Sequence, residues 1–208
     1  DPAGYPEDWD VLTEKLLRAT WKTPDEDREI RAKIVVVDTG GEGKRKRPGQ
    51  QAQHHEGVTE MAYAWWRRIR REGERRRVML IKGKGGAFDW FVRPTMVGAK
   101  AGLGDVPLSL LNTNLLKDAV DASTRCSAGP NAFHFPQWLT PGWFEEFSAE
   151  IRNPDGTWTQ IRARNEAFDL SVYIRAGCLH LGVDKWRDWT SVPAWALPLD
   201  AGNSGLIT

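Results

Sequence analysis

Two acids stand three residues apart in the segment RNEAFDLSVYIRAG, at the start of an apolar stretch near the end of the chain. Glu166 and Asp169 can both complement the positive end of a helix dipole, and Asn165 before them is a good N-cap. Residues three apart also lie on the same side of a helix, so the two carboxylates can form half of a divalent-cation site. This segment alone leaves both interpretations open.

A third acid, Asp38, directly follows the apolar run IVVV. A run of β-branched residues predicts a central strand that is buried on both faces. The segment VMLIKGKGG predicts a second strand that ends near Lys82, and the segment between them predicts a helix that stops at Gly73. In such a βαβ unit Asp38 and Lys82 lie at the same end of neighbouring parallel strands. An acid there can instead cap a helix or pair with an arginine, and a lysine can simply extend into solvent.

Three carboxylates and a lysine suit a hard cation if they converge. Magnesium and manganese prefer oxygen ligands, whereas zinc needs His or Cys at suitable spacing, and His54 and His55 are adjacent in a polar loop. Two such cations about 4 Å apart are the usual apparatus of phosphodiester hydrolysis. A neighbouring lysine can neutralise a phosphate or a developing negative charge. The chain has no GxxxxGK[ST] motif, which excludes a P-loop ATPase, and no GxSxG elbow.

The remaining segments predict an alternation of helices and strands. Further helices are predicted at 6–20, 114–123, 141–151 and from 166 onward, the last of them buried. Further strands are predicted within 88–98, 106–113 and, as a short strand, 131–136, and a hairpin at 150–163 turns at NPDG. We therefore expect an α/β fold, with one domain at 1–185 and an extended tail at 186–208.

Composition limits the class of protein. Apolar residues make up 40% and charged residues 27% of 208 residues, which is typical of a soluble globular protein. There is no apolar run of about 20 residues, no signal sequence and too few cysteines for a disulfide framework, so we expect the cytoplasm and no membrane partner. The basic stretches KRKR and WWRRIRREGERRR are either solvated surfaces or a surface for a polyanion such as DNA.

The segments VVVDTGG, VMLIKGKGG, HFP and RNEAFDLSVYIRAG together resemble the C-terminal nuclease domain of lambda-type phage terminase large subunits, in order and in spacing. GYPEDWDVL is similar to the helix that precedes the Asp-bearing strand there, and the similarity covers roughly positions 4–182. The resemblance implies an RNase H-like fold with a central mixed sheet flanked by helices. It also implies an endonuclease that cuts concatemeric double-stranded DNA by two-metal hydrolysis, so that one genome enters an empty capsid.

The resemblance assigns roles to several residues of the predicted site. Asp38 would bind metal on the central strand, and Glu166 or Asp169 would supply the acid at the start of the last helix, with the choice between them open. Lys82 matches the lysine at the end of the next strand. Thr39, Gly40 and His134 would support the site. DNA contacts are expected from a basic set: Lys44, Arg45, Lys46, Arg47, Lys84 and Lys117. Residues 44–47 lie in a segment that departs from the family pattern and resembles an insertion, which is either a DNA-contacting flap or a featureless exposed loop.

The resemblance further implies Mg²⁺ or Mn²⁺, in the form of two ions, and partners beyond DNA. In the full-length protein these would be the small terminase subunit and the capsid portal, in the host cell cytoplasm. The family carries its first catalytic aspartate on an earlier strand, and no such motif stands before IVVVD in this sequence. Either the chain is a fragment that starts after that strand, or a divergent segment supplies the acid. We therefore expect the first strands of the fold to be missing and cleavage by this piece alone to be weak or absent. Two alternatives stay open: a non-catalytic basic DNA- or partner-binding module, and another RNase H-like enzyme such as a resolvase or transposase.

Overall fold

The computed structural model describes residues 5–22, 29–40, 57–98, 105–129, 131–186 and 190. The chain divides into two compact units, and each is described by itself. Unit 1 comprises Asp1–Lys82, Pro94–Ser109 and Lys185–Thr208, and unit 2 comprises Gly83–Arg93 and Leu110–Asp184. In the described ranges no helix has the length and apolar character that crossing a bilayer requires.

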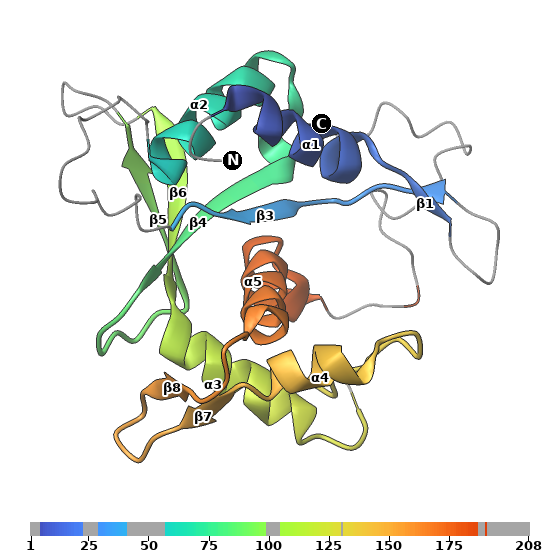
Figure 1. The fold of residues 1–208 in the computed structure, drawn as a ribbon, viewed down its shortest axis with the longest axis vertical. Coiled ribbons are helices and arrows are strands. Elements are labelled where there is room, and N and C mark those ends of the chain that lie inside the picture. The colour runs from blue at the N-terminus through green and yellow to red at the C-terminus, as the bar shows by residue number, and fades with distance from the viewer. Residues whose placement is uncertain are drawn as a thin grey trace. The chain divides into compact units, whose positions relative to one another are not determined.

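A four-stranded sheet with the strand order β3-β4-β6-β5 is the centre of the fold (Figure 1). Its strands are β3 (Val35–Asp38), β4 (Val78–Lys84), β5 (Val92–Val97) and β6 (Val106–Asn112). β3 and β4 run parallel, and Asp38 is paired with Ile81. β5 and β6 run antiparallel, since the Asp105 amide donates to the Val97 carbonyl at 3.1 Å and the Asn112 amide to the Phe91 carbonyl at 2.9 Å. The sheet is therefore mixed, as predicted.

The helix α2 (Val58–Arg71) connects β3 to β4 and completes the predicted βαβ unit. Its buried face is apolar at helical spacing and comprises Met61, Ala62, Trp65, Trp66 and Ile69. The helix ends before Gly73, whose φ of 89° lies in the left-handed region that a residue with a side chain seldom adopts. The short turn η3 (Glu74–Arg77) then leads into β4. The predicted helix and its predicted stop are both confirmed.

The N-terminal helical segment packs against α2. It consists of three successive turns of different pitch, η1 (Pro6–Trp9), α1 (Asp10–Leu12) and η2 (Thr13–Arg18), of which η2 is a π-helix. The rings of Trp9 and Trp65 lie 5.7 Å apart, and the Trp65 indole donates a hydrogen bond of 2.9 Å to the Thr13 hydroxyl. Beyond this segment, β1 (Trp21–Lys22) and β2 (Glu29–Ile30) form a small antiparallel pair.

Unit 2 is built from three helices and a hairpin. Its elements are α3 (Thr113–Thr124), α4 (Pro141–Phe147), β7 (Glu150–Arg152), β8 (Trp158–Gln160) and α5 (Glu166–His180), and the last described helical turn, which ends in unit 1, is η4 (Val183–Lys185). α5 packs against both α3 and α4. β7 and β8 pair antiparallel on either side of the NPDG turn, where Gly156 has a φ of 85°. The sequence predicted the three helices and the hairpin but not η4.

Several local expectations are wrong. Among the described strands β3 lies at the edge of its sheet and not in its centre, and β4 continues beyond Lys82 to Lys84. Residues 131–136 form no strand, because Phe133 and Phe135 pack their rings against Phe147 at 6.0 and 5.4 Å and join an aromatic cluster rather than a strand pair. α5 is not buried on all sides, since Leu170 and Ile174 are exposed. The tail from 187 onward lies outside the described residues except for position 190.

Candidate functional site

Asp38 ends β3 in a fixed conformation. The backbone amide of Gly40 donates a hydrogen bond of 2.7 Å to Asp38 Oδ1, which closes a tight turn over the carboxylate. A Cβ atom at position 40 would lie 3.0 Å from the same oxygen, so the glycine gives the carboxylate room in this turn. The turn leaves the Asp38 carboxylate at the carboxyl end of β3, the edge strand of the described sheet, which runs parallel to β4. Ligands of α/β sheets gather at the carboxyl ends of parallel strands.

Thr39 attaches this turn to the neighbouring strand and to α2. Its backbone amide and its hydroxyl both donate to the Ile81 carbonyl at 2.9 Å. The hydroxyl of Thr59, in the first turn of α2, donates to the Thr39 carbonyl at 2.7 Å. Thr39 is fully buried, so these bonds satisfy groups that water does not reach. Of the two predicted supporting residues, Gly40 therefore bonds Asp38 directly, whereas Thr39 attaches the backbone next to Asp38 to β4 and α2.

Lys82 lies at the same end of the sheet, one residue beyond the paired Ile81. Because side chains alternate along a strand, Lys82 is directed to the opposite face of the sheet from Ile81 and its partner Asp38. Lys82 is exposed. β4 continues for two residues beyond Lys82, to Lys84, so Lys82 does not end the strand as predicted.

The first turn of α5 places its two acids in different surroundings. Glu166 is 58% exposed, and Arg164 Nε lies 3.4 Å from its Oε2. The pKa of Glu166 is lowered, first by its own backbone amide at the helix start and also by Arg164, against a smaller opposing effect of desolvation. Glu166 is therefore an ionised, solvent-accessible carboxylate near neutral pH.

Asp169 lies one turn further along and is bound by two side chains. Its Oδ1 is 3.2 Å from the ammonium of Lys117, and its Oδ2 accepts a hydrogen bond of 3.0 Å from the amide of Asn165. Lys117 also contacts both carboxylate oxygens of Glu150, at 2.6 and 2.5 Å. The second N–H of the Asn165 amide donates to Glu150 at 2.7 Å.

Asn165 occupies the predicted N-cap position but does not cap with its side chain. Its backbone carbonyl accepts from the amides of Phe168 and Asp169 at 3.0 and 3.2 Å. Its side-chain amide is instead a donor to two carboxylates, which an amide N–H₂ group can satisfy at the same time. The predicted capping hydrogen bond is replaced by a tertiary contact.

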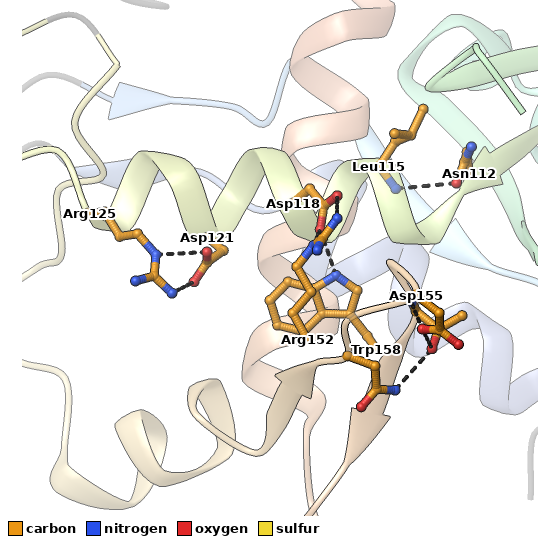
Figure 2. A network of polar contacts seen from close by, with 10 residues as sticks. Asn112, Leu115, Asp118, Asp121, Arg125, Arg152, Asp155 and Trp158 are labelled. Atoms are coloured by element: carbon orange, nitrogen blue, oxygen red, sulfur yellow. Dashed lines mark hydrogen bonds and ion pairs between the residues drawn. The ribbon is translucent and has the colours of Figure 1, made fainter. Parts of the chain in front are cut away.

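A second ion pair joins α3 to the hairpin next to the Lys117 contact. Figure 2 shows the guanidinium of Arg152 and the indole of Trp158 directed at the Asp118 carboxylate. Arg152 Nε donates to Asp118 at 2.7 Å, and Trp158 Nε1 donates at 2.9 Å. Burial raises the pKa of Asp118, but these two donors outweigh it, and the net pKa is lowered. The hairpin is thus fixed to α3 by consecutive residues of opposite charge.

The predicted DNA contacts and the supporting histidine lie in several environments. Lys84 is exposed, with its ammonium 5.1 Å from the centre of the Phe88 ring, and His134 is exposed. Lys117 is only 12% exposed, so a DNA phosphate would have to displace Glu150 from its ammonium. The predicted contacts at 44–47 lie outside the described residues.

Much of the basic stretch 65–77 is engaged within unit 1. Arg67 binds Asp105 through two nitrogens at 2.7 and 2.8 Å, which raises the pKa of Arg67 and lowers that of Asp105. Three further arginines have internal contacts: Arg68 with Asp10, Arg70 over the Trp66 ring, and the buried Arg77 with Glu74 and the Ala32 carbonyl. Arg71, Arg75 and Arg76 are exposed. A polyanion-binding surface here would therefore depend mainly on these last three.

One groove in unit 2 is unsuited to a DNA backbone. It has a volume of about 630 Å³ and runs between the loop after β4, the start of α3 and the hairpin turn. Its charged lining consists of Asp89, Asp118, Asp155 and Arg152. Three acids to one base repel phosphate, so we place no DNA strand there.

The donor chemistry of Asp38 and Glu166 fits a hard divalent cation better than that of Asp169. Both are carboxylates, whose oxygens such cations prefer. The Asp38 carboxylate is oriented by a hydrogen bond from a backbone amide, and the Glu166 carboxylate is exposed, with one long contact to an arginine. Asp169 already has an ammonium at one oxygen and an amide at the other. Among the described residues, no three His, Cys, Asp or Glu side chains gather into a metal-binding group. Asp38 belongs to unit 1 and the two α5 acids to unit 2.

Glu150 is the residue of this region that sequence reasoning missed. Its side chain is 3% exposed, yet it carries a charge that Lys117 and Asn165 satisfy. The sequence placed it at the start of a hairpin, and its partners lie 33 residues before it and 15 after it. The available signal was weak: an isolated acid between an apolar helix end and a strand.

Comparison with known proteins gives one match. The profile of the family described as "Terminase large subunit gpA, endonuclease domain" matches residues 1–189. No curated protein and no solved structure matches the chain. Because the match covers nearly all of the 208 residues and includes β3, β4 and the first turn of α5, the chain belongs to the family of terminase large subunit gpA endonuclease domains.

Proposed function

We propose that this chain is a metal-dependent endonuclease domain that cuts concatemeric double-stranded DNA during packaging. Family membership supports a nuclease role in DNA packaging. The observation that carries the metal-dependent part is Asp38, whose carboxylate is held by the Gly40 amide at the carboxyl end of β3, which runs parallel to β4. The mixed sheet, the βαβ unit and an acid at the start of α5 agree with an RNase H-like fold, which is part of the proposal.

The acids of the proposed site are Asp38 and Glu166, and the cation is Mg²⁺ or Mn²⁺, in the form of two ions. Such ions, when bound, activate a water and stabilise the departing oxygen. The protein residues have separate tasks. Gly40 and Thr39 fix the direction of the Asp38 carboxylate, and the helix start keeps Glu166 ionised. We assign Glu166 rather than Asp169 because its carboxylate is the more exposed and the less bonded.

The cationic residues of the proposal serve the DNA rather than the metal. Lys82, two residues before the end of β4, is proposed to neutralise charge at the scissile phosphate. Lys84 and the basic segment 44–47 are proposed to contact the DNA backbone outside the reacting centre, with His134 in a supporting role. Lys117 was predicted as a DNA contact, but its buried ion pairs favour an internal role. In the full-length protein, the proposed partners are the small terminase subunit and the capsid portal, in the host cytoplasm.

The test is plasmid cleavage and Mn²⁺ binding by the full-length terminase large subunit. We expect cleavage to require Mg²⁺ or Mn²⁺, and we expect Asp38→Asn and Glu166→Gln each to reduce it by at least about 100-fold. Asp121→Asn is the matched control, because Asp121 lies on α3 in an exposed pair with Arg125. Undiminished cleavage by Asp38→Asn would rule out the assigned site.

The competing hypothesis is a non-catalytic DNA-binding module. The exposed Arg71, Arg75 and Arg76 are the observation in its favour. It predicts DNA binding that falls steeply with salt and is indifferent to chelator and to the loss of Asp38 or Glu166. Binding of that kind without cleavage would replace the endonuclease proposal. A different RNase H-like nuclease, such as a resolvase, would instead cut branched DNA in preference to linear duplex.

A further inference from the structure

A buried carboxylate in unit 2 has no role in the proposed reaction. The side chain of Glu150, the first residue of β7, is 3% exposed. An ionised carboxylate at such a position is stable only when it is paired and hydrogen-bonded. Lys117 from α3 and Asn165 from the residue before α5 supply these contacts, at 2.5 to 2.7 Å.

The contacts of Glu150 close into a ring. Lys117 bonds Glu150, Glu150 accepts from Asn165, Asn165 donates to Asp169, and Asp169 returns to Lys117 at 3.2 Å. We call these four residues the α5 brace. They come from α3, β7, the N-cap position and α5, so the ring joins three elements around the first turn of α5. The ring of Phe168 lies 5.5 Å from the Lys117 ammonium and holds it from one further side.

The two ends of the brace on α5 enclose the proposed metal-binding acid. Asn165 precedes Glu166 directly, and Asp169 follows it by less than one helical turn. The Asn165 side chain is bound to the buried Glu150 carboxylate, and the Asp169 side chain to the Lys117 ammonium. The backbone between these two anchored residues therefore has little conformational freedom. The direction of Glu166 is then set by groups that do not touch the metal, as the supporting contacts of metal ligands are in other proteins.

The same contacts decide what Asp169 can do. The Lys117 ammonium already stands at its Oδ1, and a divalent ion at that carboxylate would meet a like charge within a few ångströms. We propose that the α5 brace positions Glu166, and that Asp169 is a positioning residue rather than a metal ligand, with Lys117 as its resident cation. This inference rests on the proposed function for the role of Glu166.

The experiment compares four variants of the full-length terminase large subunit by Mn²⁺ titration calorimetry, with thermal unfolding as a second measurement. Glu166→Gln removes the proposed metal ligand. Asp169→Asn and Glu150→Gln weaken the contacts of the brace, and each keeps a side chain of nearly the same size and shape. Asp118→Asn is the matched control, because it breaks the neighbouring ion pair with Arg152 between the same two elements and leaves the brace intact.

We expect Glu166→Gln to weaken Mn²⁺ binding by at least about 100-fold, and Asp169→Asn and Glu150→Gln by about 10-fold, as for the supporting contacts of other metal sites. Asp118→Asn should lower the unfolding temperature and change the Mn²⁺ affinity by less than about 2-fold, since its partner Arg152 lies outside the brace.

Three results would overturn these expectations, and they are distinguishable. If Asp169→Asn loses as much Mn²⁺ affinity as Glu166→Gln, Asp169 is a ligand. If Glu150→Gln and Asp118→Asn have the same Mn²⁺ affinity, the brace contributes to folding alone. If Glu166→Gln keeps full Mn²⁺ affinity, the proposed function fails, and the role of the brace fails with it.

Discussion

Adding a single methyl group at position 40, as in Gly40→Ala, should impair cleavage while leaving the stability of the protein nearly unchanged. In Gly40→Ala, the new Cβ would lie 3.0 Å from Asp38 Oδ1, which is closer than such atoms normally approach. The Asp38 carboxylate must move away by a few tenths of an ångström, and the hydrogen bond that it accepts from the amide of residue 40 must become longer than 2.7 Å. The change therefore acts on the direction of the carboxylate and on little else.

Two opposing terms make the effect on stability small. A side chain displaced from its preferred rotamer costs about 0.5–1.5 kcal/mol. Replacing glycine by alanine at a position with an accessible backbone conformation stabilises by about 0.4–1 kcal/mol, through the unfolded chain. The free energy of unfolding should thus stay within about 1 kcal/mol of the wild type. Catalysis is more sensitive, because a misplacement of about 1 Å in a reacting group can cost 100-fold in rate.

The assay is plasmid cleavage and Mn²⁺ binding by the full-length variant, together with denaturant unfolding. We expect cleavage to fall by about 10-fold or more while the unfolding midpoint barely moves. Gly85→Ala is the control, because a Cβ there meets nothing within 4 Å. If Gly40→Ala cleaves as well as Gly85→Ala, the direction of Asp38 does not matter to the reaction and the argument from the Gly40 turn is wrong.

We expect three further results. Asn112→Ala removes the cap of the Leu115 amide and the donor from the buried Asn112 side chain to the Phe88 carbonyl, and should lower the unfolding free energy by about 2 kcal/mol, measured in urea. Asn112→Asp should lose less because the cap survives. The pKa of Asp118 is lowered in the folded state, so its contribution to stability is present above the unfolded value near 4 and is lost as the pH falls through the folded value; unfolding curves of Asp118→Asn should therefore approach those of the wild type only in acid. Mn²⁺ at 100 times its dissociation constant should raise the unfolding free energy by about 2.7 kcal/mol, seen as a higher melting temperature that chelator reverses.

Local patterns predicted the elements of this fold well. The IVVV run, the apolar face of α2 and the Asp-Gly turn of the hairpin each produce their structure from neighbouring residues alone. The segment 131–136 shows where this reasoning ends. Its alternation of aromatic and polar residues fits a strand, but Phe135 found Trp143 and Phe144 at 5.5 and 5.3 Å as ring partners, and those lie on a helix.

The candidate site was predictable in its residue types and less so in their roles. Asp38, Thr39 and Gly40 are neighbours in sequence, so their mutual contacts could be anticipated. The roles of Glu166 and Asp169 could not be separated in that way, because the difference lies in Lys117 and Glu150, which sequence alone does not bring to Asp169. The role of a buried charged residue becomes clear only once its partner is known, and Lys117 reaches Glu150 and Asp169 through tertiary contacts.

The alternating charges on α3 and β7 also bear on the fidelity of folding. Lys117 and Asp118 are consecutive on α3, and they meet Glu150 and Arg152, two residues apart on the same side of β7. A shift of the hairpin along α3 in one direction would bring Arg152 opposite Lys117, and a shift in the other direction would bring Glu150 opposite Asp118. In either case two like charges would meet at a partly buried contact. Misaligned docking is therefore penalised in both directions, so that the correct alignment is selected by repulsion as well as by attraction.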